Sequence, residues 1–137
     1  MKIGELARLT GTKAETIRYY ETIGLLRAPG RTGGNYRDYG AADQERLAFI
    51  RHARGLGFEI ADIRSLLGLA ESPEQDCGEA DRIASGHLSA VVTKISQLEQ
   101  LRTELERMIS QCRGGQVSDC QIIQALSDHG RCAGDHA

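Results

Sequence analysis

The sequence predicts an all-α fold with a small β wing: a winged helix-turn-helix domain, then a long helix suited to an antiparallel coiled coil, then a cysteine-bearing loop. Three observations support this prediction. The 137 residues include only two prolines and few aromatics, so little interrupts helices. Two short helices separated by a glycine begin the chain, and residues 79–111 contain no proline. We expect three parts: residues 1–70, 71–111 and 112–137.

The first two helices have the pattern of a helix-turn-helix. Gly11 can adopt the left-handed conformation that ends a helix. Thr12 and Glu15 fit a capping box that starts the second helix, which buries Ile17. Two helices around a tight turn are typical of DNA-binding domains, although ordinary helical hairpins share the pattern. The apolar residues of the first helix that we expect to face inward are Ile3, Leu6, Ala7 and Leu9.

The second helix carries side chains suited to DNA. Arg and Lys bind phosphates and guanine edges, and Tyr hydroxyls donate hydrogen bonds to phosphates. The alternative interpretation places Tyr20 in the core and leaves Arg18 as a solvated charge. The candidate DNA-binding residues in this part are Thr12, Lys13, Thr16, Arg18, Tyr19 and Tyr20.

A glycine-rich stretch over residues 27–34, followed by N-Y-R-D-Y, predicts two short strands around a turn. A hairpin directly after a recognition helix would be a wing. Arg31, Tyr36 and Arg37 on that wing could hold the DNA backbone. A flexible basic loop is the alternative.

Two further helices complete the N-terminal domain. The third opens near Gly40 and Asp43 and ends at Gly57, and the fourth follows at once. We expect His52 on the surface, because nothing beside it suggests a ligand or a base. The side chains that we expect to point inward are Leu47, Phe49, Ile50, Ile60, Ile63, Leu66 and Leu67.

The longest predicted helix spans Glu79 to Gln111 and contains one glycine, Gly86. Its apolar residues recur every three or four positions, with Arg102 as an interruption. A single helix with one apolar stripe must bury it, and in a chain of this size we expect a second copy as the partner. The stripe consists of Leu88, Val91, Ile95, Leu98, Leu105, Ile109 and Cys112.

Cysteines mark both ends of this helix. Cys77 and Cys112 are 35 residues apart, roughly 52 Å along a continuous helix, so they cannot meet within one chain. In an antiparallel pair, Cys77 of one chain lies beside Cys112 of the other, and a short loop can return Cys120 to Cys112. We therefore expect a three-thiol cluster at the dimer interface, a donor set that suits soft metals. The alternative for Cys112 is plain packing in the apolar stripe.

Cys77 and Cys120 are each expected in the first turn of a helix, where the helix dipole favours the thiolate and lowers the thiol pKa. The C-terminal tail offers His129, Cys132 and His136 as auxiliary ligands, with a mobile tail as the alternative. The capping pairs that place the two cysteines are Asp76 with Glu79 and Ser118 with Gln121.

Charge and composition indicate the kind of partner and the cellular compartment. Residues 1–58 hold ten Lys/Arg and six Asp/Glu, and residues 59–137 hold seven and thirteen, so the N-terminal half is basic and suits a polyanion. The charged start does not fit a signal peptide and no run reaches transmembrane length, so we expect a cytoplasmic protein without a membrane partner. Four cysteines in a reducing compartment favour metal binding, redox chemistry or burial over disulfides.

Together these motifs resemble the MerR-type transcriptional regulators. The matching runs are M-K-I-G-E-L-A, E-T-I-R-Y-Y-E-T-I-G-L-L, G-N-Y-R-D-Y, R-L-A-F-I-R-H-A-R-G-L-G-F and I-R-S-L-L, and the resemblance covers residues 1 to about 127. It implies a homodimeric transcription activator rather than an enzyme, with double-stranded promoter DNA and RNA polymerase as partners. It also implies that the effector-bound dimer bends and untwists an overlong promoter spacer.

The resemblance also bears on the effector. Copper(I) sensors of the family resemble the chain at Cys112 and Cys120 but typically have Ser where it has Cys77, whereas divalent-metal sensors carry that Cys. The run D-C-G-E at 76–79 is similar to cadmium- and lead-responsive members. Zinc-specialised members usually add a second cysteine at the position of Arg113. The resemblance thus implies cadmium(II) or lead(II) first, then zinc(II) and mercury(II), with copper(I) on Cys112 and Cys120 alone as an alternative.

Two other classes fit the residues less well. An iron–sulfur redox sensor on the same frame needs four clustered cysteines, and the loop thiols here are too few and too widely spaced. A thiol enzyme that used Cys120 would need a base, and the sequence places no His or Asp to serve as one.

Overall fold

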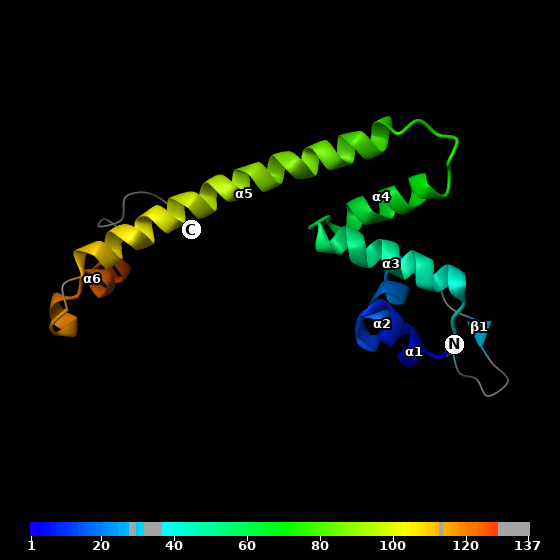
Figure 1. Ribbon diagram of the computed structural model, residues 1–137, viewed down its shortest axis with the longest axis horizontal. Helices are drawn as coiled ribbons and strands as arrows, with labels where there is room; N and C mark the ends of the chain where they lie inside the picture. Colours follow the sequence, from blue (N-terminus) through cyan, green and yellow to red (C-terminus); the bar gives the residue numbers. More distant parts are fainter. Residues whose placement is uncertain (28–29, 32–36, 113, 129–137) are drawn as a thin grey trace. The chain divides into compact units, whose positions relative to one another are not determined.

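The computed structural model describes residues 1–27, 30–31, 37–112 and 114–128. It is mostly helical, as expected, and it divides into two compact units, Met1–Ala80 and Asp81–Ala137 (Figure 1). Across the described ranges, each helix is too short or too polar to cross a membrane.

The first unit opens with α1 (Ile3–Thr10) and α2 (Ala14–Thr22), joined by a tight turn. Gly11 has a φ of 63°, and its N–H donates to the carbonyl of Ala7, which closes α1. Only glycine adopts this left-handed conformation without a steric penalty, so the turn confirms the predicted pattern of helix, glycine and helix.

The predicted capping box at the start of α2 is wrong. Lys13 precedes the helix and makes no side-chain capping hydrogen bond, so Thr12 stands one position too early. The Thr12 hydroxyl instead donates to the carbonyl of Thr10 (3.4 Å). A side-chain cap works only from the residue directly before the first turn, and this turn begins one residue later than its sequence suggests.

Two short strands follow α2. Strand β1 (Gly30–Arg31) pairs with β2 (Arg37–Asp38) in antiparallel register, with Gly30 opposite Asp38 and Arg31 opposite Arg37. Residues 32–36 lie outside the described part of the chain. The wing therefore stays a prediction, whereas the helical frame that would carry it is established.

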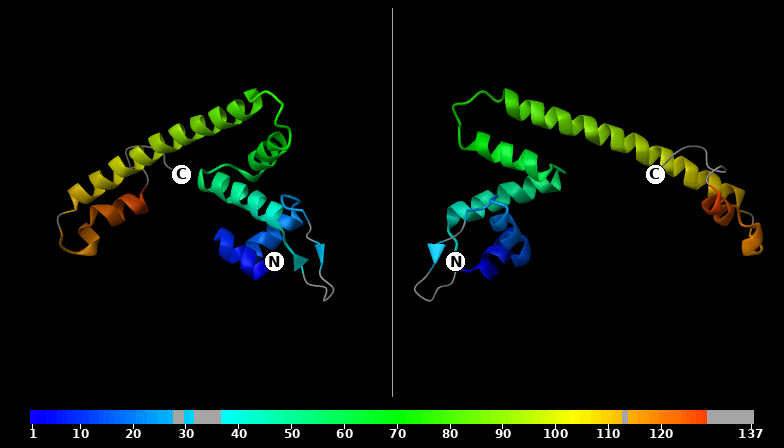
Figure 2. Two further views of the ribbon diagram at one scale, coloured as in Figure 1. Left: turned by 45° about the vertical axis from the view of Figure 1, so that its right-hand side comes forward. Right: turned by 180° about the vertical axis from the view of Figure 1, so that it is seen from behind.

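Helices α3 (Ala41–Gly55) and α4 (Ile60–Ala70) complete the first unit and form its largest helical pair in Figure 2. The Asp43 carboxylate accepts the N–H of Gly40 (2.8 Å) at the start of α3. Gly57 turns the chain between the two helices with a φ of 88°. The fully buried side chains at the centre of this core are Leu6, Ile17, Leu25, Leu47, Ile50 and Ile63.

Several of the expected inward-facing residues are less buried than predicted, among them Ile3 and Ala7, which are half-buried. Leu9 and Phe49 are exposed, so those two predictions are wrong. Ile60 and Leu66 are half-buried. Apolar spacing identifies a helix, but the neighbouring helices decide how wide a stripe of it they cover.

The second unit consists mainly of α5 (Gly78–Gln111), whose first residues belong to the first unit. Its 34 residues form one continuous helix, roughly 51 Å long, which confirms the unbroken helix that the sequence predicts. The short 3-10 turn η1 (Val117–Asp119) and helix α6 (Gln121–Ser127) follow it.

Candidate functional site

The last turns of α5 lie beside α6, as the views in Figures 1 and 2 agree. Two side chains on this part of α5, Glu104 and Met108, are buried, and Ala125 is buried on α6. This contact folds the C-terminal segment back along the helix, and so it brings the residue before α6 towards the end of α5.

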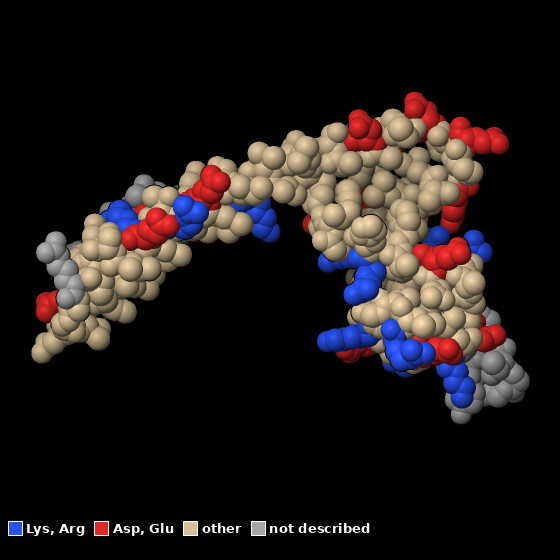
Figure 3. Space-filling model, viewed as in Figure 1, with Lys and Arg blue, Asp and Glu red and all other residues tan. Residues whose placement is uncertain are grey.

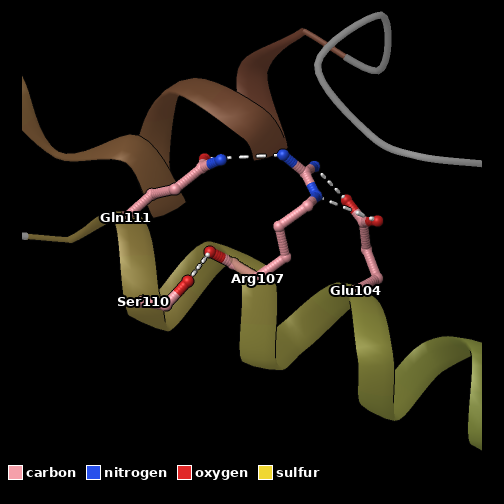
Figure 4. Close-up of polar contacts among 4 residues, drawn as sticks. All are labelled: Glu104, Arg107, Ser110 and Gln111. Atoms are coloured by element: carbon pink, nitrogen blue, oxygen red, sulfur yellow. Dashed lines mark hydrogen bonds and ion pairs between the residues drawn. The ribbon is translucent and has the colours of Figure 1, made fainter.

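A partly buried ion pair lies in this contact. The Arg107 guanidinium meets the Glu104 carboxylate at 2.5 Å through Nη2 and at 3.5 Å through Nε, and Nη1 donates to the side chain of Gln111 (3.4 Å; Figure 4). The burial of this pair was not predicted from the sequence. The available signal was the opposite charge at i and i+3, which exposed helices also show, so sequence alone gives no reason to expect burial.

Cys112 and Cys120 are brought together by the loop between them. Gly114 and Gly115 both have positive φ, 78° and 94°, and they reverse the chain directly after α5. Cys120 is the residue before the first turn of α6, and the Cys112 thiol lies near enough to contribute to the lowering of the Cys120 pKa. The predicted proximity of these two thiols is therefore present within one chain.

The environment of Cys120 lowers its thiol pKa from the ordinary value of 9.0. The largest cause is the backbone N–H of Ile123, burial acts in the opposite direction, and the N–H of Ile122 and the Cys112 thiol add to the lowering. The side chain forms no full capping hydrogen bond, so the N–H groups act on it electrostatically. The thiolate, which is the form that binds metals, is favoured here.

The capping box that we predicted for α6 is wrong. Ser118 lies inside the 3-10 turn and its carbonyl accepts the side-chain N–H of Gln124 (3.0 Å). Cys120 itself takes the capping position, two positions earlier in the helix than expected. It remains at the positive end of the helix dipole, so the predicted direction of its pKa change holds.

Cys77 lies at the opposite end of α5 and is exposed. The helix begins at Gly78, so Cys77 precedes the first turn instead of lying within it, a shift of one residue from the prediction. The Asp76 carboxylate accepts the Gly78 N–H (3.2 Å) as expected of a cap. Within the described part of a single chain, no three His, Cys, Asp or Glu side chains gather in a metal-sized cluster. His129, Cys132 and His136 lie outside the described residues.

The apolar stripe of α5 is open. More than half of each side chain of Leu98, Leu105 and Ile109 is exposed, and Leu88, Val91, Val92 and Ile95 continue the exposed stripe towards the start of the helix. At 100° per residue, Leu98, Leu105 and Ile109 lie about 100–140° around the helix from Glu104, and most of the earlier stripe residues lie further round. Cys112 continues the spiral at the border of the two faces, beside the face that a second copy could cover.

The candidate DNA-binding residues of α2 divide into two sets. Lys13 and Arg18 are exposed and Tyr19 is 54% exposed, whereas Tyr20 is 8% exposed and belongs to the core. The placement of Tyr20 on the DNA-facing surface is therefore wrong, because its ring fills the space against the helices behind it. Lys and Arg are visible over the helices of this unit in Figure 3, and acidic residues are visible over the segment that joins α4 to α5.

Other candidates are less defined by the structure. Thr12 and Thr16 are half-buried. Tyr36 and the side chains of Arg31 and Arg37 lie outside the described part. The DNA-binding role of all these residues stays a prediction.

Comparison with known proteins supports the resemblance. The family model described as "MerR HTH family regulatory protein" matches residues 1–69, and the one described as "MerR, DNA binding" matches residues 44–108. The transcriptional regulator HmrR of Rhizobium leguminosarum bv. viciae is 42% identical over 128 residues, covering 93% of this chain and 98% of its own. ZntR of Escherichia coli K12 is 39% identical, covering 91% of each chain.

A solved structure is also similar. The transcription regulator PbrR691 from Ralstonia metallidurans CH34, in complex with lead(II), matches with a TM-score of 0.80 and 36% identity over 92% of this chain and 98% of its own. These relatives are regulators of transcription and not enzymes. The chain belongs to the MerR family of helix-turn-helix transcriptional regulators.

Proposed function

We propose that the chain is a metal-responsive activator of transcription that binds promoter DNA as a homodimer. In this proposal cadmium(II) or lead(II) is held by Cys112 and Cys120 of one chain together with the partner's Cys77. The observation that carries it is the unbroken α5, which separates Cys77 from Cys112 and Cys120, two thiols near enough for one to lower the pKa of the other. The division of labour that we propose is residues 1–70 for DNA, 71–111 for dimerisation and 112–137 for the metal.

The thiol pair fits a soft metal ion. Its two sulfurs already approach each other, and the lowered pKa of Cys120 reduces the cost of removing a proton on binding. Two thiols leave a divalent ion under-coordinated, and Cys77 is the exposed third thiol of the described chain. The lead(II) complex of PbrR691 and the name of a 35% identical relative in Haemophilus influenzae, "Probable heavy metal-dependent transcriptional regulator", support a metal effector. Zinc(II) and mercury(II) are the next candidates.

The open stripe of α5 supports a second copy as the partner. A helix that leaves so many large apolar side chains in water gains roughly 25 cal/mol for each Å² that a partner covers. An antiparallel arrangement places the start of one α5 beside the end of the other. That arrangement would bring the partner's Cys77 to the border of the stripe where Cys112 lies.

The output of the proposed regulator is a change in DNA shape. The exposed side chains of Lys13, which directly precedes α2, and of Arg18 and Tyr19 on α2 would hold the DNA, with the wing residues Arg31, Tyr36 and Arg37 on the adjacent backbone. Metal binding shifts the dimer towards a form that bends and untwists the promoter spacer, so that RNA polymerase engages both of its recognition elements. Specificity of this kind depends on DNA deformability as well as on base contacts.

An anaerobic titration with cadmium(II) tests the site. The reduced chain and its Cys77→Ser variant are followed by the thiolate-to-metal charge-transfer absorbance. We expect stoichiometric saturation of the native dimer, and in the variant a loss of about one third of the band intensity and weaker binding, as the removal of one thiolate in three requires. An unchanged titration of Cys77→Ser would contradict the cross-dimer site.

The second candidate is a copper(I) sensor that uses Cys112 and Cys120 only. It is favoured by the fact that one chain brings these two thiols together without help from Cys77. In that case Cys77→Ser would bind copper(I) like the native chain, and cadmium(II) would bind weakly to both.

A further inference from the structure

The connection that follows α2, residues 23–26, is held by two arginines from other helices. In α4, Arg64 donates from Nη2 to the carbonyl of Ile23 (2.7 Å), and in α3, Arg46 donates from Nε to the carbonyl of Leu25 (2.8 Å). Leu25 is fully buried, and its N–H donates to the carbonyl of Tyr20 in α2 (2.8 Å). The end of α2 therefore moves together with this connection.

Arg46 has a second partner on a different segment. Its Nη1 donates to the Glu71 carboxylate at 2.7 Å, and Glu71 is the residue that directly follows α4. From Glu71 the chain passes through five exposed residues, 72–76, to reach Cys77. One guanidinium thus joins the connection behind α2 to the segment that carries a proposed metal ligand, and all of these residues belong to the same compact unit.

The geometry of the guanidinium makes this link stiff. Its N–H groups lie in one plane at fixed angles, so its two hydrogen bonds cannot reorient independently. A displacement of Glu71 must either break the ion pair or turn the guanidinium against the carbonyl of Leu25. The Leu25 side chain has no free space in which to yield, because it is fully buried.

We propose that Arg46 is a positioning residue that couples the segment between α4 and α5 to the orientation of α2, and so carries the metal signal to the DNA-binding helix. The inference rests on the proposed metal response. A purely stabilising role would need only the bond to Leu25. The pair with Glu71, whose side chain is 56% exposed, adds little stability by itself, as exposed ion pairs seldom do.

Glu71→Ala is the informative variant, because it removes the ion pair with Arg46 and leaves the hydrogen bond from Arg46 to the carbonyl of Leu25. The matched control is Glu74→Ala, which removes the same charge three residues further along the same exposed segment. A second variant, Arg46→Lys, keeps the positive charge but cannot span both partners with one planar group.

The experiment uses the full reduced chain and a doubly dye-labelled DNA fragment selected by the native chain from a random-sequence pool. Energy transfer across the DNA is measured with and without cadmium(II), DNA affinity without metal is measured by anisotropy, and cadmium(II) affinity is measured by absorbance. We expect Glu71→Ala to keep both affinities within about twofold and to reduce the cadmium-induced shift between DNA geometries by about two- to fivefold. Glu74→Ala should match the native chain.

A second readout needs no metal. In the metal-free chain, amide hydrogen exchange at Leu25 and Leu26 should be faster in Arg46→Lys than in the native chain, since the connection loses a donor. The double variant Arg46→Lys/Glu71→Ala should reduce the cadmium-induced shift no further than the larger single effect, because both changes act on one link.

The outcomes separate the two proposals. If the native chain changes DNA geometry with cadmium(II) and Glu71→Ala does so to the same extent, the coupling role of Arg46 is wrong while the metal response stands. If the native chain itself binds DNA but shows no change with the metal, the proposed function fails and the coupling role fails with it.

Discussion

The partly buried ion pair between Glu104 and Arg107 leads to a prediction about the contact between α5 and α6. The Glu104 side chain is 9% exposed and Arg107 is 32% exposed, so the two partners are not equivalent. Removing Arg107 takes its guanidinium away from a carboxylate that is only 9% exposed. Removing Glu104 leaves a guanidinium that water already reaches.

The magnitudes follow from this asymmetry. Breaking a fully buried pair costs about 3–5 kcal/mol, and partial access of water at Arg107 reduces this, so we expect Arg107→Ala to lower the free energy of unfolding by about 2–3 kcal/mol. Glu104→Ala should cost about 1 kcal/mol. The control is Glu106→Ala, which removes an exposed pair with Arg102 (3.0 Å) and should change stability by less than about 0.5 kcal/mol.

The assay is urea unfolding of the reduced, metal-free chain at one fixed protein concentration, because the stability of a dimer depends on concentration. The rate at which Cys120 reacts with a thiol reagent is measured in parallel, since loss of the contact should release α6 and raise that rate. A double variant, Glu104→Met/Arg107→Leu, should recover most of the lost stability, because it removes both charges together. If Arg107→Ala costs no more than Glu106→Ala, or if the double variant is as unstable as Arg107→Ala, the reasoning is refuted.

Three further predictions concern other parts of the chain. Leu98→Asp should weaken dimerisation at least about tenfold in sedimentation, because it places a charge in the α5 stripe, whereas Leu126→Asp on α6 should leave the dimer intact. Alkylation of Cys120 in a Cys77→Ser background should reach half its maximal rate below pH 9.0. Because the pKa of Cys120 is lower in the folded state, the native state binds fewer protons than the unfolded state between the two pKa values. The thiolate therefore adds to stability above the unfolded-state pKa, and this contribution is lost as the pH falls through the folded-state pKa. A midpoint at or above 9.0 would contradict this. Gly11→Ala should lower the free energy of unfolding by about 1–2 kcal/mol in urea, because φ at this turn is 63° and the Arg51 guanidinium lies 3.0 Å from the added methyl group. Gly4→Ala is the control and should not lower it, because no atom lies within 4 Å of the added methyl group.

Local features of the chain were predicted well where they depend on neighbours in sequence. The turn at Gly11 and the continuity of α5 from Gly78 to Gln111 follow from residue types within one or two helical turns. The side-chain caps failed at Thr12 and Ser118, because a cap depends on the exact residue at which a helix begins, and these helices begin one and two residues later than predicted.

Burial was predicted less well. Leu9, Phe49 and Tyr20 share the apolar or aromatic character of their neighbours, yet two of them are exposed and the third is in the core. Apolar periodicity gives the direction of the buried face, but its width depends on which helices arrive from elsewhere in the chain. The same reason explains why Glu104, a charged residue in a polar-looking stretch, is buried beside α6.

The sequence by itself determined the parts and their order: the helix, glycine and helix at the start, the long helix with cysteines at both ends, and the loop whose glycines return Cys120 to Cys112. Each of these depends on contacts between residues close together in the chain. Only the tertiary structure decided the link from Glu71 through Arg46 to Leu25, because its members come from three segments separated by 21 and 25 residues. A local sequence pattern does not predict which distant carbonyl or carboxylate a guanidinium contacts, because the packing of α3 and α4 against the end of α2 determines these partners.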